Sequence, residues 1–347
     1  MTDRMGTMEK FKVAVVGIGA VGTEMIRLLK RRNFPAESVT ILARREREEV
    51  IDGDTYHVLP ASPEALDGMD FAFFAGTEGA KGASQTLGWE AVRRGCIVID
   101  NGDDFRMDDR VPLVVPEVNP EAVQGHQGFL ANPNCSTIIA LMAIAPLHRA
   151  AGVERFVACT YQAVSGTGAA AVTELEDQTR AWAAGQDPQT EVYPHPIAFN
   201  VLPQIGGDKV EPGVTSEELK MKRETHKILG DDSIRVSTTC VRVPVFNSHS
   251  EAIHLELKKP LSVEDAREVL SQAPGVRVMD DLSRAEFPMP ITASGKEDVF
   301  VGRIRLDTSV DNGLALFVAG DNLWKGAAQN AIQIAEKLIE QDLVKVP

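Results

Sequence analysis

The sequence of 347 residues predicts an α/β protein, with a doubly wound parallel sheet in its N-terminal part and a second, α+β domain. Three observations lead to this prediction. Short β-branched runs alternate with helical segments through residues 11–99, and a glycine-rich turn follows the first of these runs. Residues 234–318 hold several strand-like runs with few helical segments between them, which is typical of an antiparallel or mixed sheet.

The first predicted strand, Phe11–Val16, is short and apolar and ends at the turn Gly17–Gly22, which has the pattern Gly-x-Gly-x-x-Gly. A helix over Glu24–Arg32 and a strand over Val39–Ala43 follow. In this context the glycines let a pyrophosphate approach the helix N-terminus, so we expect a Rossmann-type dinucleotide site. The alternative is a turn that uses glycine only for close packing. The candidate cofactor residues are Gly17, Gly19, Ala20, Val21 and Gly22.

The alternation continues with a strand over Phe71–Ala75, a helix over Ala80–Arg94 and a strand over Ile97–Ile99. Ligands of such sheets bind at the carboxyl ends of the strands. Gly76 and Thr77 are therefore further cofactor candidates, although a glycine turn at this place also needs no function.

The second strand ends in Ala43-Arg44-Arg45, where an NAD site usually carries an acid. Two guanidinium groups suit the 2′-phosphate of NADP, because they form bidentate, charge-assisted bonds. The sequence therefore favours NADP. Alternatively, the two arginines are solvated or pair with Glu46 and Glu48.

Cys135 is predicted to lie where a turn becomes a helix. Pro133 disfavours the helical region for the residue before it, and an apolar, helix-competent run covers residues 136–145. A cysteine at a helix N-terminus faces unpaired N–H groups and the positive end of the dipole, which stabilise a thiolate. The segment therefore suggests a nucleophile, and the alternative is a buried structural cysteine.

The rest of the chain is predicted to form the second domain and to return to the first. A strand is expected over Phe156–Val164, a helix over Ala169–Ala184, a long ordered loop over Gln186–Gly213 and a helix over Ser216–Leu229. Further strands are expected over Ile234–Val245, Ala252–Leu257, Val299–Leu306 and Gly313–Val318. A long amphipathic helix over Leu323–Glu340 closes the chain. We expect residues 1–134 and 322–347 to bind NADP and residues 135–321 to form the catalytic domain.

The net charge of −14 argues against nucleic acid and anionic membranes as partners. No apolar run approaches the ~18 residues of a membrane span, and the N-terminus has no signal-peptide pattern. The cysteines are far apart and lack Cys-x-x-Cys spacing, so we expect neither disulfides nor a metal site, and a cytoplasmic location. They are Cys96, Cys135, Cys159 and Cys240.

Cys135 beside a nicotinamide cofactor suggests one reaction class. A thiolate adds to an aldehyde, hydride leaves to the cofactor, and a second nucleophile releases the acyl group from the resulting thioester. Arg242, among apolar residues, could bind a substrate carboxylate, and His249 could transfer protons. Taken alone, the polar segment around His249 favours a surface turn beyond the strand. Gln162 could orient a substrate or simply satisfy a backbone group.

Three segments together match one family: Asn132–Thr137 (NPNCST), Tyr161–Gly168 (YQAVSGTG) and Arg242–Glu251 (RVPVFNSHSE). Pro112–Asn119 (PLVVPEVN) and Asp321–Ala328 (DNLWKGAA) match it less specifically. Through them the chain resembles the aspartate-semialdehyde dehydrogenases along almost its whole length. The resemblance implies the reversible, NADP-dependent interconversion of L-aspartate 4-semialdehyde plus phosphate with L-4-aspartyl phosphate, in lysine, threonine, methionine and diaminopimelate biosynthesis. It also implies a homodimer or homotetramer assembled through the second domain.

The resemblance also implies roles for single residues. Cys135 is similar to the acyl-thioester nucleophile and His249 to the acid/base. Gln162 and Arg242 are similar to the residues that orient the substrate, with Arg242 on its α-carboxylate. Glu217 matches the acid that contacts the substrate amino group.

Two phosphate-site cations are implied as well, Arg106 and Lys220. The loop before Arg106 carries Asp103 and Asp104 where the family usually has serines, and Arg45 also departs from the usual serine. Besides the glycine turn, the NADP-contacting positions implied are Arg44, Arg45, Ser165, Gly166 and Asn322.

Two other readings stay open at this point. N-acetyl-γ-glutamyl-phosphate reductases share the architecture and the thioester chemistry, but their cysteine segment usually reads Gly-Cys-Tyr rather than Asn134-Cys135-Ser136. The second is an NADP-binding regulatory homologue that has lost catalysis.

Overall fold

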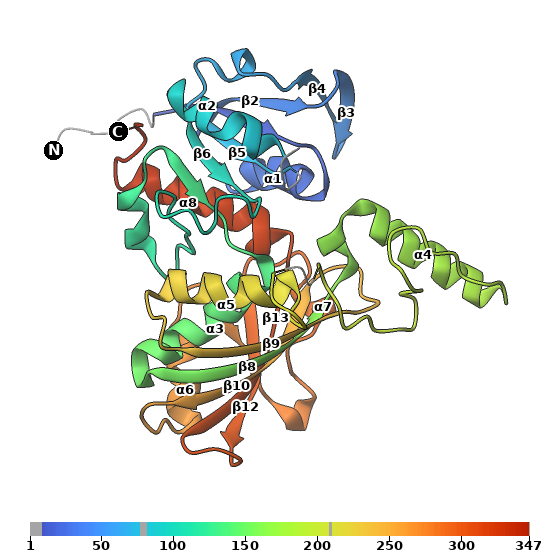
Figure 1. The fold of residues 1–347 in the computed structure, drawn as a ribbon, viewed down its shortest axis with the longest axis vertical. Helices are drawn as coiled ribbons and strands as arrows, with labels where there is room; N and C mark the ends of the chain where they lie inside the picture. Colours follow the sequence, from blue (N-terminus) through green and yellow to red (C-terminus); the bar gives the residue numbers. More distant parts are fainter. Residues whose placement is uncertain (1–8, 77–81, 208–209, 347) are drawn as a thin grey trace. The chain divides into compact units, whose positions relative to one another are not determined.

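A computed structural model describes residues 9–76, 82–207 and 210–346 (Figure 1). The chain forms two compact units. Unit 1 consists of Met1–Pro112, Glu121–Asn132 and Ala331–Pro347, and unit 2 of Leu113–Pro120 and Pro133–Asn330.

Unit 1 is built on a seven-stranded sheet with the order β3-β4-β2-β1-β5-β6-β7. All neighbouring pairs are parallel except the hairpin β3–β4. The predicted parallel sheet is therefore confirmed, with an antiparallel edge. The strands are β1 (Phe11–Val16), β2 (Ala36–Ala43), β3 (Arg47–Ile51), β4 (Asp54–Pro60), β5 (Phe71–Phe74), β6 (Ile97–Asp100) and β7 (Phe129–Ala131).

The helices of unit 1 differ in detail from those predicted. The first one begins at Ala20, directly after the glycine turn, rather than at Glu24. The segment expected as one helix over residues 80–94 contains a π turn followed by a short α-helix in its described part. The elements are α1 (Ala20–Arg31), η1 (Glu64–Leu66), η2 (Ser84–Gly88), α2 (Trp89–Arg93), η3 (Pro120–Gly125) and α8 (Gln329–Glu340).

Unit 2 is built on a six-stranded mixed sheet with the order β11-β12-β13-β10-β8-β9. The central pairs are antiparallel, and the outer pairs β8–β9 and β11–β12 are parallel, as expected of a mixed sheet. The strands are β8 (Val153–Gln162), β9 (Arg235–Arg242), β10 (His249–Leu257), β11 (Val276–Val278), β12 (Val299–Asp307) and β13 (Gly313–Gly320).

Helices α3 (Cys135–Ala151) and α5 (Ser216–Leu229) pack on this sheet and on each other (Figure 1). Helix α3 is apolar and buried along most of its length, and Thr215 and Glu218 form a capping box at the start of α5. The remaining elements are η4 (Val164–Thr167), α4 (Ala169–Ala183), α6 (Val263–Ser271), η5 (Leu282–Arg284), α7 (Pro290–Ala293) and η6 (Trp324–Ala328). The predicted terminal helix over 323–340 thus begins as the π turn η6 and becomes α-helical at Gln329.

The described part of the loop over 186–213 contains no helix or strand, yet it is held in place. Gln178 of α4 accepts hydrogen bonds from the N–H groups of Ile197 (2.8 Å) and Ala198 (3.0 Å). Ile197 and Leu202 also join a small apolar cluster with α4. The expected ordered loop is confirmed there. Among the described residues, no helix is long and apolar enough to cross a membrane.

Candidate active site

Cys135 is the first residue of α3, as the sequence predicts. The side-chain oxygen of Asn134 caps the helix by accepting hydrogen bonds from the N–H groups of Ser136 (3.0 Å) and Thr137 (3.2 Å). The thiol side chain is partly buried. The cap fixes the first turn of α3 and with it the backbone that carries Cys135.

Asn134 also ties α3 to α5. Its backbone N–H donates to Glu224 Oε2 (2.7 Å), and its side-chain Nδ2 donates to Glu217 Oε1 (2.9 Å). Both glutamates are buried and lie two helical turns apart on one face of α5. Asn134 and Glu224 were not among the residues predicted from the sequence. A signal was available, because two acids seven residues apart on a helix face that also carries apolar residues need buried partners.

Gln162, the last residue of β8, meets the same carboxylate. Its Nε2 donates to Glu217 Oε1 (3.0 Å), and its own Oε1 accepts from Thr160 Oγ1 (2.9 Å). Lys220 Nζ lies 3.8 Å from Glu217 Oε2. The structure thus brings together Gln162, Glu217 and Lys220, all predicted as site residues, around one buried carboxylate beside the start of α3.

Arg242 and His249 form a second group within unit 2. Both are buried, and they meet at Ala163, whose oxygen accepts from Arg242 Nη1 (2.7 Å) and whose N–H donates to His249 Nδ1 (3.0 Å). Gly166 lies against both: a Cβ atom there would be 3.0 Å from Arg242 Nη1 and 3.2 Å from His249 Nε2. Within the described residues, Arg242 Nε and His249 Nε2 have no hydrogen-bond partner.

The expectation that His249 lies in a surface turn beyond a strand was wrong. His249 is the first residue of β10 and has no exposed surface. Burial, and then the nearby Arg242, lower its pKa well below the ordinary value, so the ring is neutral. Because the Ala163 N–H can only donate, Nδ1 presents its lone pair and the neutral ring carries its proton on Nε2.

Ser165 and Asn322, predicted to contact NADP, are neighbours in unit 2. Asn322 Nδ2 donates to Ser165 Oγ (3.0 Å), and Asn322 Oδ1 accepts from the N–H of Ser248 (2.8 Å). The pair is therefore held next to the strand that begins at His249.

The glycine turn of unit 1 has the close backbone approach that a dinucleotide site needs. A Cβ atom on Gly22 would lie 2.0 Å from Gly17 O, and one on Gly17 would lie 3.1 Å from Gly76 Cα. Residue 19 has open space around it, and Ala20 and Val21 begin α1. The turns after β1 and β5 therefore meet, and their geometry fits a bound pyrophosphate. Thr77 lies outside the described residues.

The two arginines after β2 are exposed. Their acidic neighbours have another partner, because His57 lies 3.1 Å from Glu46 and 2.7 Å from Glu48. Within the described residues, no ion pair joins Arg44 or Arg45 to either glutamate. The arrangement leaves both guanidinium groups available for an anionic ligand.

Arg106 belongs to unit 1 and is buried. Its Nε donates to Asn132 O (2.9 Å) and its Nη2 to Asn101 O (2.8 Å). These two bonds hold the guanidinium between the loop after β6 and the segment that precedes Cys135 in sequence.

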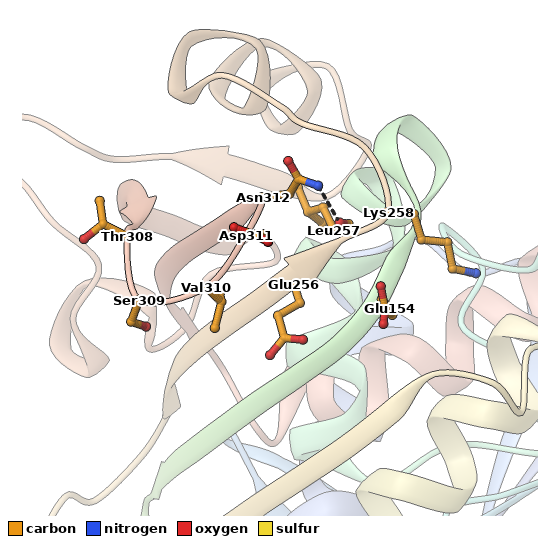
Figure 2. Close-up of a pocket in the computed structure, with 9 residues that line it drawn as sticks. All are labelled: Glu154, Glu256, Leu257, Lys258, Thr308, Ser309, Val310, Asp311 and Asn312. Atoms are coloured by element: carbon orange, nitrogen blue, oxygen red, sulfur yellow. Dashed lines mark hydrogen bonds between the residues drawn. The ribbon is translucent and has the colours of Figure 1, made fainter.

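A surface pocket of about 550 Å³ in unit 2 contains none of the predicted site residues (Figure 2). It lies at the Leu257 end of β10, whereas His249 lies at the opposite end of that strand. Its polar lining includes Glu154, Glu256, Lys258 and Asp311. The pocket is therefore separate from the residues around Cys135.

Two family models match the chain. The model described as "Semialdehyde dehydrogenase, NAD binding domain" matches residues 12–126, and "Semialdehyde dehydrogenase, dimerisation domain" matches residues 144–325. Unit 1 thus contains most of an NAD(P)-binding domain, and unit 2 contains all the residues matched by the dimerisation-domain model.

Relatives match over nearly the full length. The aspartate-semialdehyde dehydrogenase of Aquifex aeolicus is 46% identical over 344 residues, 96% of this chain and 99% of its own. That of Bacillus subtilis is 45% identical over 345 residues, 96% of this chain and 98% of its own. The crystal structure of aspartate semialdehyde dehydrogenase II from Vibrio cholerae, complexed with ASA, is similar with a TM-score of 0.91 and 41% identity, covering 96% of this chain and 99% of that one. By these matches, the chain belongs to the aspartate-semialdehyde dehydrogenase family.

Proposed function

We propose that this protein catalyses the reversible, NADP-dependent conversion of L-aspartate 4-semialdehyde plus phosphate to L-4-aspartyl phosphate, through a thioester on Cys135. The observation that carries the proposal is the group of polar side chains around the capped start of α3. Gln162 and Asn134 both donate to Glu217 there, directly beside the residue that would form the thioester. The names of the relatives support the substrate.

In the reductive direction, Cys135 Sγ attacks the acyl carbon of the acyl phosphate. The carbon–oxygen bond to phosphate breaks, phosphate leaves, and a thioester remains. When bound, NADPH supplies a hydride to the acyl carbon. The carbon–sulfur bond then breaks, which releases the aldehyde and returns the thiolate.

His249 acts in this proposal from its protonated Nε2. The resting tautomer donates a hydrogen bond to the carbonyl oxygen, where negative charge develops as Sγ attacks. This role of Nε2 refines the acid/base role that the resemblance implies. Because Nδ1 accepts a hydrogen bond from the Ala163 N–H, only Nε2 can donate or accept a proton during the reaction.

Arg242 and Glu217 hold the two ends of the amino-acid substrate. Because Nη1 of Arg242 is bonded to Ala163 O, the Nε–Nη2 edge would form the two parallel bonds to the α-carboxylate. The Glu217 carboxylate would accept from the substrate amino group. Its Oε1 already accepts from Asn134 and Gln162, so Oε2 is the oxygen that faces the substrate.

Lys220, near Glu217, and Arg106 would bind the inorganic phosphate. Asp103 and Asp104 lie close to Arg106 in sequence, and we expect them to weaken phosphate binding relative to a serine-rich loop. A double Asp103→Ser, Asp104→Ser variant should lower the KM for phosphate and leave the KM for the aldehyde unchanged.

NADP would be held by the glycine turn, by Arg44 and Arg45 on the 2′-phosphate, and by Ser165, Gly166 and Asn322. A double Arg44→Ala, Arg45→Ala variant should raise the KM for NADPH and leave the KM for NADH unchanged. Equal effects on both cofactors would contradict the role of the arginines.

We also propose a homodimer or homotetramer, formed through the dimerisation domain, in the cytoplasm. Light scattering on the purified protein gives the oligomeric state.

The decisive assay measures NADPH formation from aspartate semialdehyde and from N-acetylglutamate semialdehyde, with and without phosphate or arsenate. We expect phosphate-dependent turnover of the first substrate only. The Cys135→Ala variant should fold and be inactive, whereas Cys159→Ala, a control on β8, should keep its activity.

Arg242→Lys should raise the KM for the aldehyde, since one ammonium cannot form two parallel bonds. Turnover of the acetylated substrate would instead indicate an N-acetyl-γ-glutamyl-phosphate reductase, and cofactor binding without turnover a regulatory protein.

A further inference from the structure

A glycine of the π turn η6 stands directly against the proposed nucleophile. A Cβ atom on Gly326 would lie 2.9 Å from Cys135 Cβ and 3.4 Å from Cys135 Cα. Carbon atoms prefer a separation of about 3.5–4.0 Å, so even an alanine would overlap Cys135 by about 0.6 Å. Gly326 does not have a positive φ. Its backbone therefore suits any residue, and the missing side chain is required by Cys135 alone.

The π turn cannot easily move away from Cys135. Asp321 holds its start, because its Oδ1 accepts from the N–H groups of Leu323 (2.9 Å) and Trp324 (3.0 Å). The N–H of Gly326 itself donates to Asp321 O (2.9 Å). On its other carboxylate oxygen, Asp321 accepts from Asn247 Nδ2 (2.8 Å) and from the N–H of Gly295 (2.8 Å).

The middle of the turn is anchored as well. Lys325, next to Gly326, is fully buried, and its Nζ pairs with Glu117 Oε2 (2.5 Å) and donates to Asn330 Oδ1 (2.8 Å). Breaking a buried ion pair of this kind would leave an uncompensated charge, so the turn resists displacement.

Cys135 is fixed from its own side too. Asn134 caps α3 and bonds to Glu217 and Glu224 on α5. An added methyl group at position 326 would thus be caught between two anchored segments. Rotation about the Cα–Cβ bond moves Sγ but leaves Cβ and Cα in place, so the overlap is relieved only if the Cys135 Cβ atom itself shifts, and Sγ shifts with it.

We infer that Gly326 is a positioning residue for Cys135. The anchored π turn packs against Cys135, and the absence of a side chain at position 326 determines the position of the thiol. This deepens the proposed function and rests on it for the catalytic consequence. A misplacement of the reacting atom by about 1 Å can cost about 100-fold in rate. The smaller overlap here predicts a loss of about 10- to 100-fold in kcat for Gly326→Ala.

The kinetic test compares Gly326→Ala with Gly125→Ala. Gly125 has no heavy atom within 4 Å of a Cβ position and no positive φ, so it matches the backbone change without the contact. We expect Gly326→Ala to lower kcat and the rate of Cys135 alkylation by iodoacetamide, with little change in the KM for NADPH. The control should keep both rates. Wild-type kcat and alkylation rate in Gly326→Ala would overturn the inference.

A stability test is independent of the activity. Gly326→Ala is also made in a Cys135→Gly background, which lacks the Cβ atom that the methyl group meets. We expect Gly326→Ala to lower Tm in the Cys135 protein and to lower it much less in the Cys135→Gly protein, because residues in contact are coupled. If Gly326→Ala fails to fold, Cys135→Gly should restore folding. An equal Tm loss in both backgrounds, or no rescue, overturns the inference. An inactive wild type would refute the proposed function and leave this stability test valid.

Discussion

Asn134 performs two tasks with one amide group, and replacing it with aspartate separates them. Its Oδ1 caps α3, and its Nδ2 donates to Glu217 Oε1 at 2.9 Å. In Asn134→Asp the capping oxygen remains, because aspartate is as good an N-cap as asparagine. The donor, however, becomes a carboxylate oxygen facing another carboxylate.

The size of the penalty follows from this geometry. Two like charges about 4 Å apart repel by about 4 kcal/mol at an effective dielectric constant of about 20. The fold can avoid the repulsion by holding one proton on the new pair. With an ordinary carboxyl pKa near ~4, holding that proton costs about 4 kcal/mol at pH 7 and about 1.4 kcal/mol at pH 5. The folded variant then binds more protons than the unfolded chain, so its stability falls as pH rises.

Urea unfolding at pH 7 and pH 5 measures this directly. Asn134→Ser is the matched control, because it keeps a capping oxygen and adds no charge. We expect it to lose only the bond to Glu217, about 1.5–3 kcal/mol, with little dependence on pH. The reasoning is refuted if Asn134→Asp is as stable as the wild type at pH 7, or if its deficit is the same at both pH values.

Three other predictions concern buried groups. Burial, and then Glu217, raise the pKa of Glu251 well above its ordinary value. The free energy of unfolding of the wild type therefore falls as pH rises above about 4.3. Glu251→Gln lacks this carboxyl group, so urea titrations should show its stability rising relative to the wild type by about 1.4 kcal/mol per pH unit. A difference in stability that does not change with pH would show that the Glu251 carboxylate is ionised in the folded protein. Because the pKa of His249 is lowered in the folded protein, His249 contributes to the free energy of unfolding above about pH 6.5, and this contribution is lost as pH falls below that value. His249→Asn should flatten the acid limb of the stability profile, and an unchanged acid limb in this variant would contradict the effect of burial. Gly166→Ala should raise the KM for the aldehyde by displacing Arg242, whereas an unchanged KM would mean that the guanidinium can shift freely.

Much of the fold follows from local patterns, and the exceptions have physical reasons. The buried strand β1 is apolar at nearly every position, so its run of residues is enough to predict it. The hairpin β3–β4 lies at the sheet edge and is mostly exposed, so no apolar pattern marks it. Its turn did carry a signal: Asp52 and Gly53 have φ values of 53° and 88°, and Asp-Gly favours a turn with two positive φ values.

The candidate site was predicted only in part, because its contacts are long-range. Cys135 could be placed at a helix start, since the Pro133 rule and the apolar run are local. The bonds of Asn134 to α5 join residues 83 and 90 positions apart, which no local pattern reveals. The burial of His249 is likewise a property of the sheet. The polar residues next to it in sequence predict an exposed turn, which is the opposite of what the structure shows.

Glu217 Oε1 accepts two hydrogen bonds, from Asn134 and from Gln162, and these bonds bear on the stage of folding at which the candidate site forms. That single oxygen joins the start of α3 and the end of β8 to α5, across 83 and 55 positions of sequence. Contacts this distant form late, because the intervening chain must first lose its loop entropy. A chain with only local helices and hairpins would lack both of these bonds, so Cys135 would not yet be joined to Gln162 and Glu217. The proposed nucleophile and the residues proposed to bind the substrate would therefore come together late in folding.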